Sequence, residues 1–244
     1  MQCRFPTSWK FSKVIPLHKK GSKIDKKNYR PVAILSPISK ILEKIVFEQV
    51  YGYFNRNNIF GSNLHGYREN CSSQTALITM YDRWARAAAL GKISGAVFLD
   101  LSAAFDLVDH KILAQKLKIY GLDGDFLHWM TSYLENRYQA VWIDHTLSSF
   151  LYCDAGVPQG SILGPLLFLT YFNDLSEYLE GSVDSYADDT TITAVGGSLN
   201  EIEIKLEHDC EKASTWLKSN KLKLNAEKNT FINIGYTKKI IVTV

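Results

Sequence analysis

Two runs of β-forming residues meet at a pair of adjacent aspartates, Asp188 and Asp189, and this arrangement constrains the fold more than any other feature. Residues 183–187 and 190–195 are rich in β-branched and aromatic side chains, which is typical of a β-hairpin. Hairpin turns favour Asn-Gly or Gly-Gly, whereas adjacent carboxylates repel each other. A bound cation would relieve that repulsion, and carboxylate oxygens suit Mg²⁺. The alternative is a solvated Asp-Asp turn without function.

A third carboxylate, Asp100, ends the short apolar run of residues 95–99. Such a run predicts a buried strand. If its end lies beside the hairpin, three carboxylates around two Mg²⁺ ions can activate a hydroxyl and stabilise leaving pyrophosphate. The alternative for Asp100 is a helix N-cap. Asp106 and Asp109 suit that role better, since Asp109 directly precedes an amphipathic stretch over residues 110–120.

Several further sequence blocks carry a resemblance to a known family. Residues 98–106, 156–161 and 186–189 occur in the order of polymerase motifs A, B and C. Other matching blocks are residues 19–21, 28–31, 39–44, 66–68, 132–137, Trp216 and 220–225. Together they cover the chain from about Pro6 to Ile234 and resemble the reverse transcriptase domain of non-LTR (LINE-type) retrotransposons.

The resemblance implies an α+β fold, the fingers and palm of a right-hand polymerase, with an antiparallel palm sheet packed on helices. Fingers are expected over residues 1–95 and palm over 96–244, with about 119–152 returning to the fingers. The family's thumb and an upstream endonuclease are expected to be absent from this chain. Helix and strand patterns that mix without regular alternation independently favour α+β.

By resemblance, the chain is an RNA-directed DNA polymerase that takes an RNA template, a DNA primer and dNTPs. The implied cofactor is a pair of Mg²⁺ ions, with Mn²⁺ as a substitute. Asp100, Asp188 and Asp189 are the implied catalytic residues and metal ligands, with the Leu101 carbonyl as a further ligand. Phe105 is expected beneath the incoming sugar, where a ring would exclude a 2′-hydroxyl; simple burial is the alternative.

The remaining implied site residues bind substrate or nucleic acid. The substrate-binding set is Gln159, Gly160, Lys19, Lys20, Arg30 and Lys228. Arg68 and Arg137 are expected to contact the nucleic-acid backbone, with a surface salt bridge as the alternative. Ala103 departs from the family, in which most members have lysine there, so this chain has one cation fewer near the nucleotide.

Charge is distributed unevenly along the 244 residues. Residues 1–30 hold nine of the 28 lysines and arginines but only one of the 25 acids, Asp25. A basic segment facing an acidic body suits a nucleic-acid channel, whereas a solvated basic arm is the alternative.

No apolar stretch is long enough for a membrane span, and nothing resembles a secretory signal. Scattered cysteines without CxxC spacing predict reduced thiols, so an intracellular protein, nuclear or cytoplasmic, is expected.

The sequence periodicity also predicts individual elements. A helix starting at Ser36–Pro37 has apolar residues at helical spacing from Ile38 through Ile41 and Ile45 to Val50. A helix over residues 73–90 has its core face at Leu77, Tyr81, Trp84 and Ala88. The other expected elements are a hairpin at 139–152, helices at 161–178 and 199–219, and strands at 222–225 and 231–234.

Two other functions compete with RNA-directed DNA synthesis. A catalytically idle nucleic-acid-binding remnant fits the expected loss of the thumb, whereas three intact carboxylates count against it. An RNA-templated RNA polymerase shares the carboxylate chemistry, and Phe105 counts against it.

Overall fold

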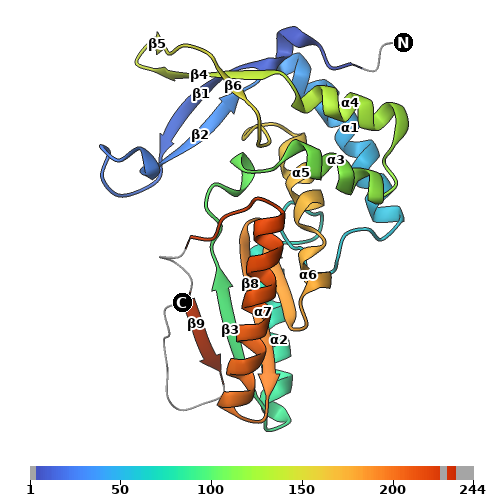
Figure 1. Ribbon diagram of the computed structural model, residues 1–244, viewed down its shortest axis with the longest axis vertical. Helices are drawn as coiled ribbons and strands as arrows, with labels where there is room; N and C mark the ends of the chain where they lie inside the picture. Colours follow the sequence, from blue (N-terminus) through green and yellow to red (C-terminus); the bar gives the residue numbers. More distant parts are fainter. Residues whose placement is uncertain (1–3, 226–229, 235–244) are drawn as a thin grey trace. The chain divides into compact units, whose positions relative to one another are not determined.

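The computed structural model describes residues 4–225 and 230–234, and it confirms an α+β fold (Figure 1). The chain forms two compact units. Unit 1 comprises Met1–Ile59 and Phe105–Tyr171, and unit 2 comprises Phe60–Ala104 and Phe172–Val244. These boundaries differ from the division into fingers at 1–95 and palm at 96–244, which stays a prediction.

Unit 1 is built on a five-stranded sheet in the order β2-β1-β4-β5, with β6 also paired to β4. Its strands are β1 (Phe11–His18), β2 (Tyr29–Ile34), β4 (Arg137–Ile143), β5 (Thr146–Leu147) and β6 (Leu151–Cys153). β1 and β4 run parallel and the other pairs are antiparallel. Asp144 and His145 take positive φ values of 45° and 64°, as a two-residue hairpin turn requires. The expected hairpin at 139–152 is therefore confirmed.

The helices of unit 1 are α1 (Pro37–Arg56), α3 (His110–Ile119), α4 (Gly124–Leu134) and most of α5 (Leu163–Phe172). Asp109 caps α3 as predicted, because its carboxylate accepts hydrogen bonds from the N–H groups of Lys111 and Ile112. The short 3₁₀ turns are Thr7–Lys10, Lys26–Asn28 and Ala104–Asp106.

Helix α1 forms as expected, but its apolar residues do not all face the core. Ile38, Ile41 and Ile45 are exposed, whereas the polar pair Ser39 and Glu43 is fully buried. Glu43 accepts hydrogen bonds from the Ser39 hydroxyl at 2.8 Å and from the first N–H groups of the α5 region at 2.8 and 3.4 Å. Because a helix N-terminus attracts negative charge, this contact stabilises the buried carboxylate.

Unit 2 is built on an antiparallel four-stranded sheet in the order β7-β8-β3-β9. Its strands are β3 (Ile93–Leu99), β7 (Ser182–Tyr186), β8 (Asp189–Gly196) and β9 (Thr230–Ile234). The predicted hairpin, the strand before Asp100 and the strand near 231–234 are all confirmed. Helices α2 (Ser73–Ala89) and α7 (Leu199–Ser219) pack on this sheet, and α6 (Leu175–Tyr178) contacts α7.

Three predictions about secondary structure are wrong in detail. Helix α2 buries Ala76, Met80 and Ala87, whereas Leu77 and Tyr81 are 59% and 71% exposed. The small side chains of Ala76 and Ala87 allow α2 to pack closely on β3 and β7. The helical spacing therefore predicted the helix correctly but its buried face incorrectly. The helix expected over 161–178 is broken into α5 and α6, and residues 222–225 form only an isolated bridge at Leu224.

Candidate catalytic carboxylate edge

Asp188 lies in the tight turn that joins β7 to β8. Tyr186 pairs with Asp189, so the turn consists of Ala187 and Asp188 alone. Ala187 has a φ of 58°, a left-handed conformation that hairpin turns of this length require and that costs free energy in a residue with a Cβ atom. Asp188 is half-buried and Asp189 is exposed. The predicted hairpin is therefore confirmed, but only Asp188 lies in its turn, because Asp189 is the first residue of β8.

Strand register brings Asp100 to the same edge. In the β3–β8 ladder the last pair is Leu99 with Thr190, so Asp100, one residue further, lies across from Asp189. Both carboxylates line one groove of about 420 Å³ in unit 2. The other lining residues come from α2, β3, β7 and β8. The structure therefore brings Asp100 and Asp189 together, with Asp188 next in the turn.

Asn225 holds Asp100 from the other side, a role that the sequence did not reveal. Its side-chain amide donates to the Asp100 carboxylate at 2.8 Å, and its backbone N–H donates to the Asp100 carbonyl at 2.8 Å. The Ser102 N–H donates to the Lys223 carbonyl, so the chain at 223–225 flanks Leu101. Neither backbone bond uses the Leu101 carbonyl. That oxygen and the three carboxylates are hard ligands of the kind that Mg²⁺ prefers.

Within the part of the chain that the structure describes, no group of three His, Cys, Asp or Glu side chains forms a ready-made metal cage. Mg²⁺ sites that handle phosphates commonly use one or two carboxylates and complete their shell with water and substrate oxygens. The donor set at this edge fits that pattern.

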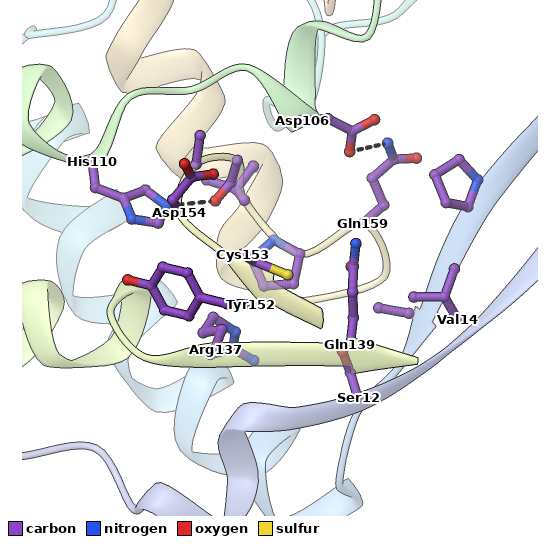
Figure 2. Close-up of a pocket in the computed structure, with 16 residues that line it drawn as sticks. Ser12, Val14, Asp106, His110, Arg137, Gln139, Tyr152, Cys153, Asp154 and Gln159 are labelled. Atoms are coloured by element: carbon purple, nitrogen blue, oxygen red, sulfur yellow. Dashed lines mark hydrogen bonds between the residues drawn. The ribbon is translucent and has the colours of Figure 1, made fainter. Parts of the chain in front are cut away.

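A second pocket, of about 370 Å³, lies within unit 1 (Figure 2). The Gln159 amide donates to the Asp106 carboxylate at 2.8 Å. Burial raises the pKa of Asp106, and this hydrogen bond and the charge of Lys19 partly oppose the rise. Gly160, next to Gln159, has a φ of 107°, and a Cβ atom there would lie 2.7 Å from the Ala33 carbonyl oxygen. The Ala33 N–H also donates to the Gln159 carbonyl at 2.7 Å, so this loop is docked on β2.

The three basic residues expected to grip the triphosphate lie at one end of the β1–β2 hairpin and are all exposed: Lys19, Lys20 and Arg30. Phe105 stacks on Phe168 of α5, with ring centroids 4.6 Å apart and an interplanar angle of 17°, and is half-buried. Lys228 lies outside the described residues. The roles of these residues stay predictions.

Arg68 and Arg137 are occupied by contacts within the protein. Arg68 donates to the Gly61 carbonyl at 2.6 Å and to the Leu64 carbonyl at 3.1 Å. Arg137 is 4% exposed, donates to the Tyr133 carbonyl at 2.8 Å and lies over the Tyr133 ring at 4.9 Å. These contacts favour structural roles over the predicted nucleic-acid contacts.

The described helices include none that is long and apolar enough to cross a membrane. Cys71, Cys153 and Cys210 are free thiols, in agreement with the expectation for these three.

Comparison with known proteins identifies the class to which this fold and carboxylate edge belong. The family model described as "Reverse transcriptase (RNA-dependent DNA polymerase)" matches residues 17–240. The chain therefore belongs to the reverse transcriptase family.

Among its relatives are two Drosophila melanogaster proteins. The chain is 28% identical over 246 residues to the probable RNA-directed DNA polymerase from transposon BS, a match that covers 97% of this chain and 27% of the relative. It is 27% identical over 241 residues to the probable RNA-directed DNA polymerase from transposon X-element, covering 96% and 26%. The chain thus spans about a quarter of the length of these relatives.

Solved structures show the same fold. Telomerase from Candida tropicalis, in a complex with the TWJ fragment of telomeric RNA, matches with a TM-score of 0.68 at 11% identity, covering 97% of this chain and 42% of that one. The apo enzyme truncated from its C-terminal domain matches with a TM-score of 0.62 at 13% identity, covering all of this chain and 55% of that one. At such identities the likeness concerns the fold alone.

Proposed function

We propose that this chain is the catalytic portion of an RNA-directed DNA polymerase that extends a DNA 3′ end on an RNA template with dNTPs. The observation that carries the proposal is the strand register that sets Asp100 across from Asp189, with Asp188 in the adjoining turn. The names of the Drosophila relatives, which describe RNA-directed DNA polymerases of transposons, support the same reaction.

In this proposal, Asp100, Asp188 and the Leu101 carbonyl would hold two Mg²⁺ ions, with Asp189 as a supporting ligand. When bound, the ions make the primer 3′-hydroxyl easier to deprotonate and offset negative charge on the leaving pyrophosphate. Asn225 orients Asp100 through its amide. Mn²⁺ can take the place of Mg²⁺, because both prefer oxygen ligands.

The basic residues Lys19, Lys20 and Arg30 bind the triphosphate, and the Gln159–Gly160 loop contacts the nucleotide or template. Lys228 protonates pyrophosphate. Phe105 excludes ribonucleotides by its bulk beneath the sugar. Arg68 and Arg137 bind backbone carbonyls of the protein itself, so we assign them structural roles and no direct contact with nucleic acid. Because dNTPs and RNA are intracellular, we place this reaction in the nucleus or the cytoplasm.

Primer extension on a primed RNA with Mg²⁺ and dNTPs tests the proposal. Wild-type protein should extend the primer, and Asp188→Asn should abolish extension while the affinity for the primed template, measured by fluorescence anisotropy, is retained. Comparable extension by the variant would refute the metal assignment. A folded wild-type chain that binds the template without extending it would instead be the idle remnant.

The Phe105→Val substitution separates DNA from RNA synthesis. Removing the ring should raise incorporation of ribonucleotides relative to deoxynucleotides by about tenfold or more, as expected when steric exclusion sets specificity. The measurement is the ratio of the two kcat/KM values. An unchanged ratio would remove the argument against an RNA-templated RNA polymerase.

A further inference from the structure

A buried carboxylate, Asp184, lines the same groove as Asp100 and Asp189 and has no role in the proposed chemistry. Asp184 is in the middle of β7, four residues before Asp188, and its side chain is 1% exposed. Aspartate is rarely buried unless it is paired, because removal of the charge from water is costly. Aspartate also has a low propensity for β-strands. The position therefore calls for a specific partner.

That partner is Arg83 of α2. Its two terminal nitrogens contact the two Asp184 carboxylate oxygens at 2.5 and 3.3 Å, a bidentate arrangement. Asp184 pairs with Thr191, and Tyr186 pairs with Asp189 two positions further along β7. Since side chains alternate between the faces of a strand, Asp184 and Asp189 lie on the same face of the hairpin. The ion pair thus joins α2 to the face that carries a catalytic carboxylate.

A second contact reaches the turn itself. Residues 63–66 run along β7: the His65 N–H donates to the Ser185 carbonyl at 2.8 Å, and the Ser185 N–H donates to the Asn63 carbonyl at 2.9 Å. At the end of this segment, a Cβ atom on Gly66 would lie 2.3 Å from the Ala187 nitrogen. Only glycine permits this close approach of two backbones. The segment therefore supports the turn residue that precedes Asp188.

The same segment is connected to the start of α2. The His65 Nδ1 atom lies 3.3 Å from the Thr75 hydroxyl, and Thr75 forms a capping box with Ser72. Helix α2 is therefore joined to the hairpin twice, through residues 63–66 near its first turn and through Arg83 in its second half. Two separated attachments resist both sliding and rotation of the hairpin.

We propose that Arg83 and Gly66 are positioning residues that hold Asp188, in the turn, and Asp189, at the start of β8, at the geometry needed to bind metal. The inference rests on the proposed function for its kinetic consequences, and its effect on metal affinity can be measured without catalysis. Support from outside the ligand set commonly changes metal affinity or activity by about 10- to 100-fold.

The first experiment compares Arg83→Met with Arg86→Met in the full chain. Arg86 is on the same helix, but its ion pair with Asp82 is exposed, with side chains 77% and 57% accessible. Binding of Mn²⁺ is measured by isothermal titration calorimetry, well below the unfolding temperature of each variant. Arg83→Met should weaken Mn²⁺ binding about tenfold and lower kcat with little change in the KM for dNTP. Arg86→Met should leave both quantities unchanged, and Arg83→Lys should restore part of the affinity.

The second experiment compares Gly66→Ala with Gly52→Ala. Gly52 is in α1 and has no atom within 4 Å of an added Cβ, so its substitution should not affect metal binding. Gly66→Ala should displace the turn and reduce Mn²⁺ affinity by at least as much as Arg83→Met does.

If Arg83→Met fails to fold, Asp184→Asn, which keeps the side-chain shape, takes its place in the first comparison.

Folded Arg83→Met and Gly66→Ala proteins with wild-type Mn²⁺ affinity and wild-type kcat would overturn the inference. Failure of the proposed function would be observed differently: the wild-type chain itself would not extend a primer. In that case the Mn²⁺ comparison still decides whether Arg83 and Gly66 shape the carboxylate edge.

Discussion

The carboxylate edge of unit 2 and the basic end of the β1–β2 hairpin in unit 1 carry opposite charges and are built differently. At the carboxylate edge, each aspartate has a position fixed by strand register, and Asp100 is also held by Asn225. In unit 1, Lys19 and Lys20 are exposed side chains that follow the end of a strand. Groups that must bind metal at fixed distances require close support, whereas long cations can adapt to a triphosphate.

This comparison predicts that substitutions at the two places have different kinetic effects. Disturbing the carboxylate edge should lower kcat, because the geometry at the reacting atoms changes. Disturbing the exposed cations should raise the KM for dNTP, because binding is weakened in both the ground state and the transition state. The Gln159–Gly160 loop of unit 1 is docked on β2 through the Ala33 backbone. A substitution there tests whether unit 1 also depends on precise backbone placement.

Gly160→Ala should have the largest effect on stability. The new Cβ atom would lie 2.7 Å from the Ala33 carbonyl oxygen, at a φ of 107° that side chains rarely adopt. We expect a loss of about 2 kcal/mol or more in the free energy of unfolding, measured by urea denaturation. Gly124→Ala is the control, because its φ is also positive but an added Cβ atom there meets nothing within 4 Å. Equal losses in both variants would show that the contact with Ala33 is unimportant.

Asn225→Ala should lower kcat for primer extension about tenfold, since it removes the amide that orients Asp100. The KM for dNTP should change little. Asn225→Asp serves as a second variant: it keeps the shape but replaces the donor with an acceptor, and it should be at least as impaired. A change confined to KM would mean that Asn225 helps to bind dNTP. It would then contradict the expected difference between the carboxylate edge and the exposed cations.

Lys20→Ala should raise the KM for dNTP about threefold with nearly unchanged kcat, because one exposed cation contributes under about 1 kcal/mol to binding. The effect should diminish as the salt concentration rises, which steady-state kinetics at two ionic strengths can measure. Lys218→Ala, at an exposed position on α7, is the control. A loss of kcat in Lys20→Ala would contradict the distinction between the two regions.

The smallest expected effect concerns pH. Burial lowers the pKa of His65; the charges of Arg68 and Arg83 contribute to the decrease, and Asp184 opposes it. The unfolded chain therefore binds a proton at His65 more readily than the folded chain, so this residue favours folding above its ordinary pKa of about 6.5 and less so as pH falls below it. Urea unfolding at pH 7.5 and 5.5 should show a smaller stability loss in His65→Gln than in the wild type. An identical loss of unfolding free energy in the variant and the wild type would show that His65 does not contribute to the pH dependence of stability.

Local patterns predicted the β7–β8 hairpin, the strand before Asp100 and helices α3 and α7, because each has a clear period and clear end signals. The face of α2 could not be predicted, because its buried residues Ala76 and Ala87 are small and Leu77 is exposed. The supporting contacts of Arg83 and Asn225 were missed for another reason. Their partners lie 101 and 125 residues away in sequence, and such pairing depends on tertiary packing. An aspartate inside a strand, Asp184, was the one local signal for the ion pair.

A change of metal preference in Asp188→Cys would test most directly whether the turn binds a catalytic ion. Thiolate is a poor ligand for Mg²⁺ and a better one for softer ions. In single-turnover primer extension, the variant should be inactive with Mg²⁺ and regain activity with Mn²⁺, whereas the wild type should be active with both. Extension by the variant with Mg²⁺ at the wild-type rate would show that Asp188 is not a metal ligand.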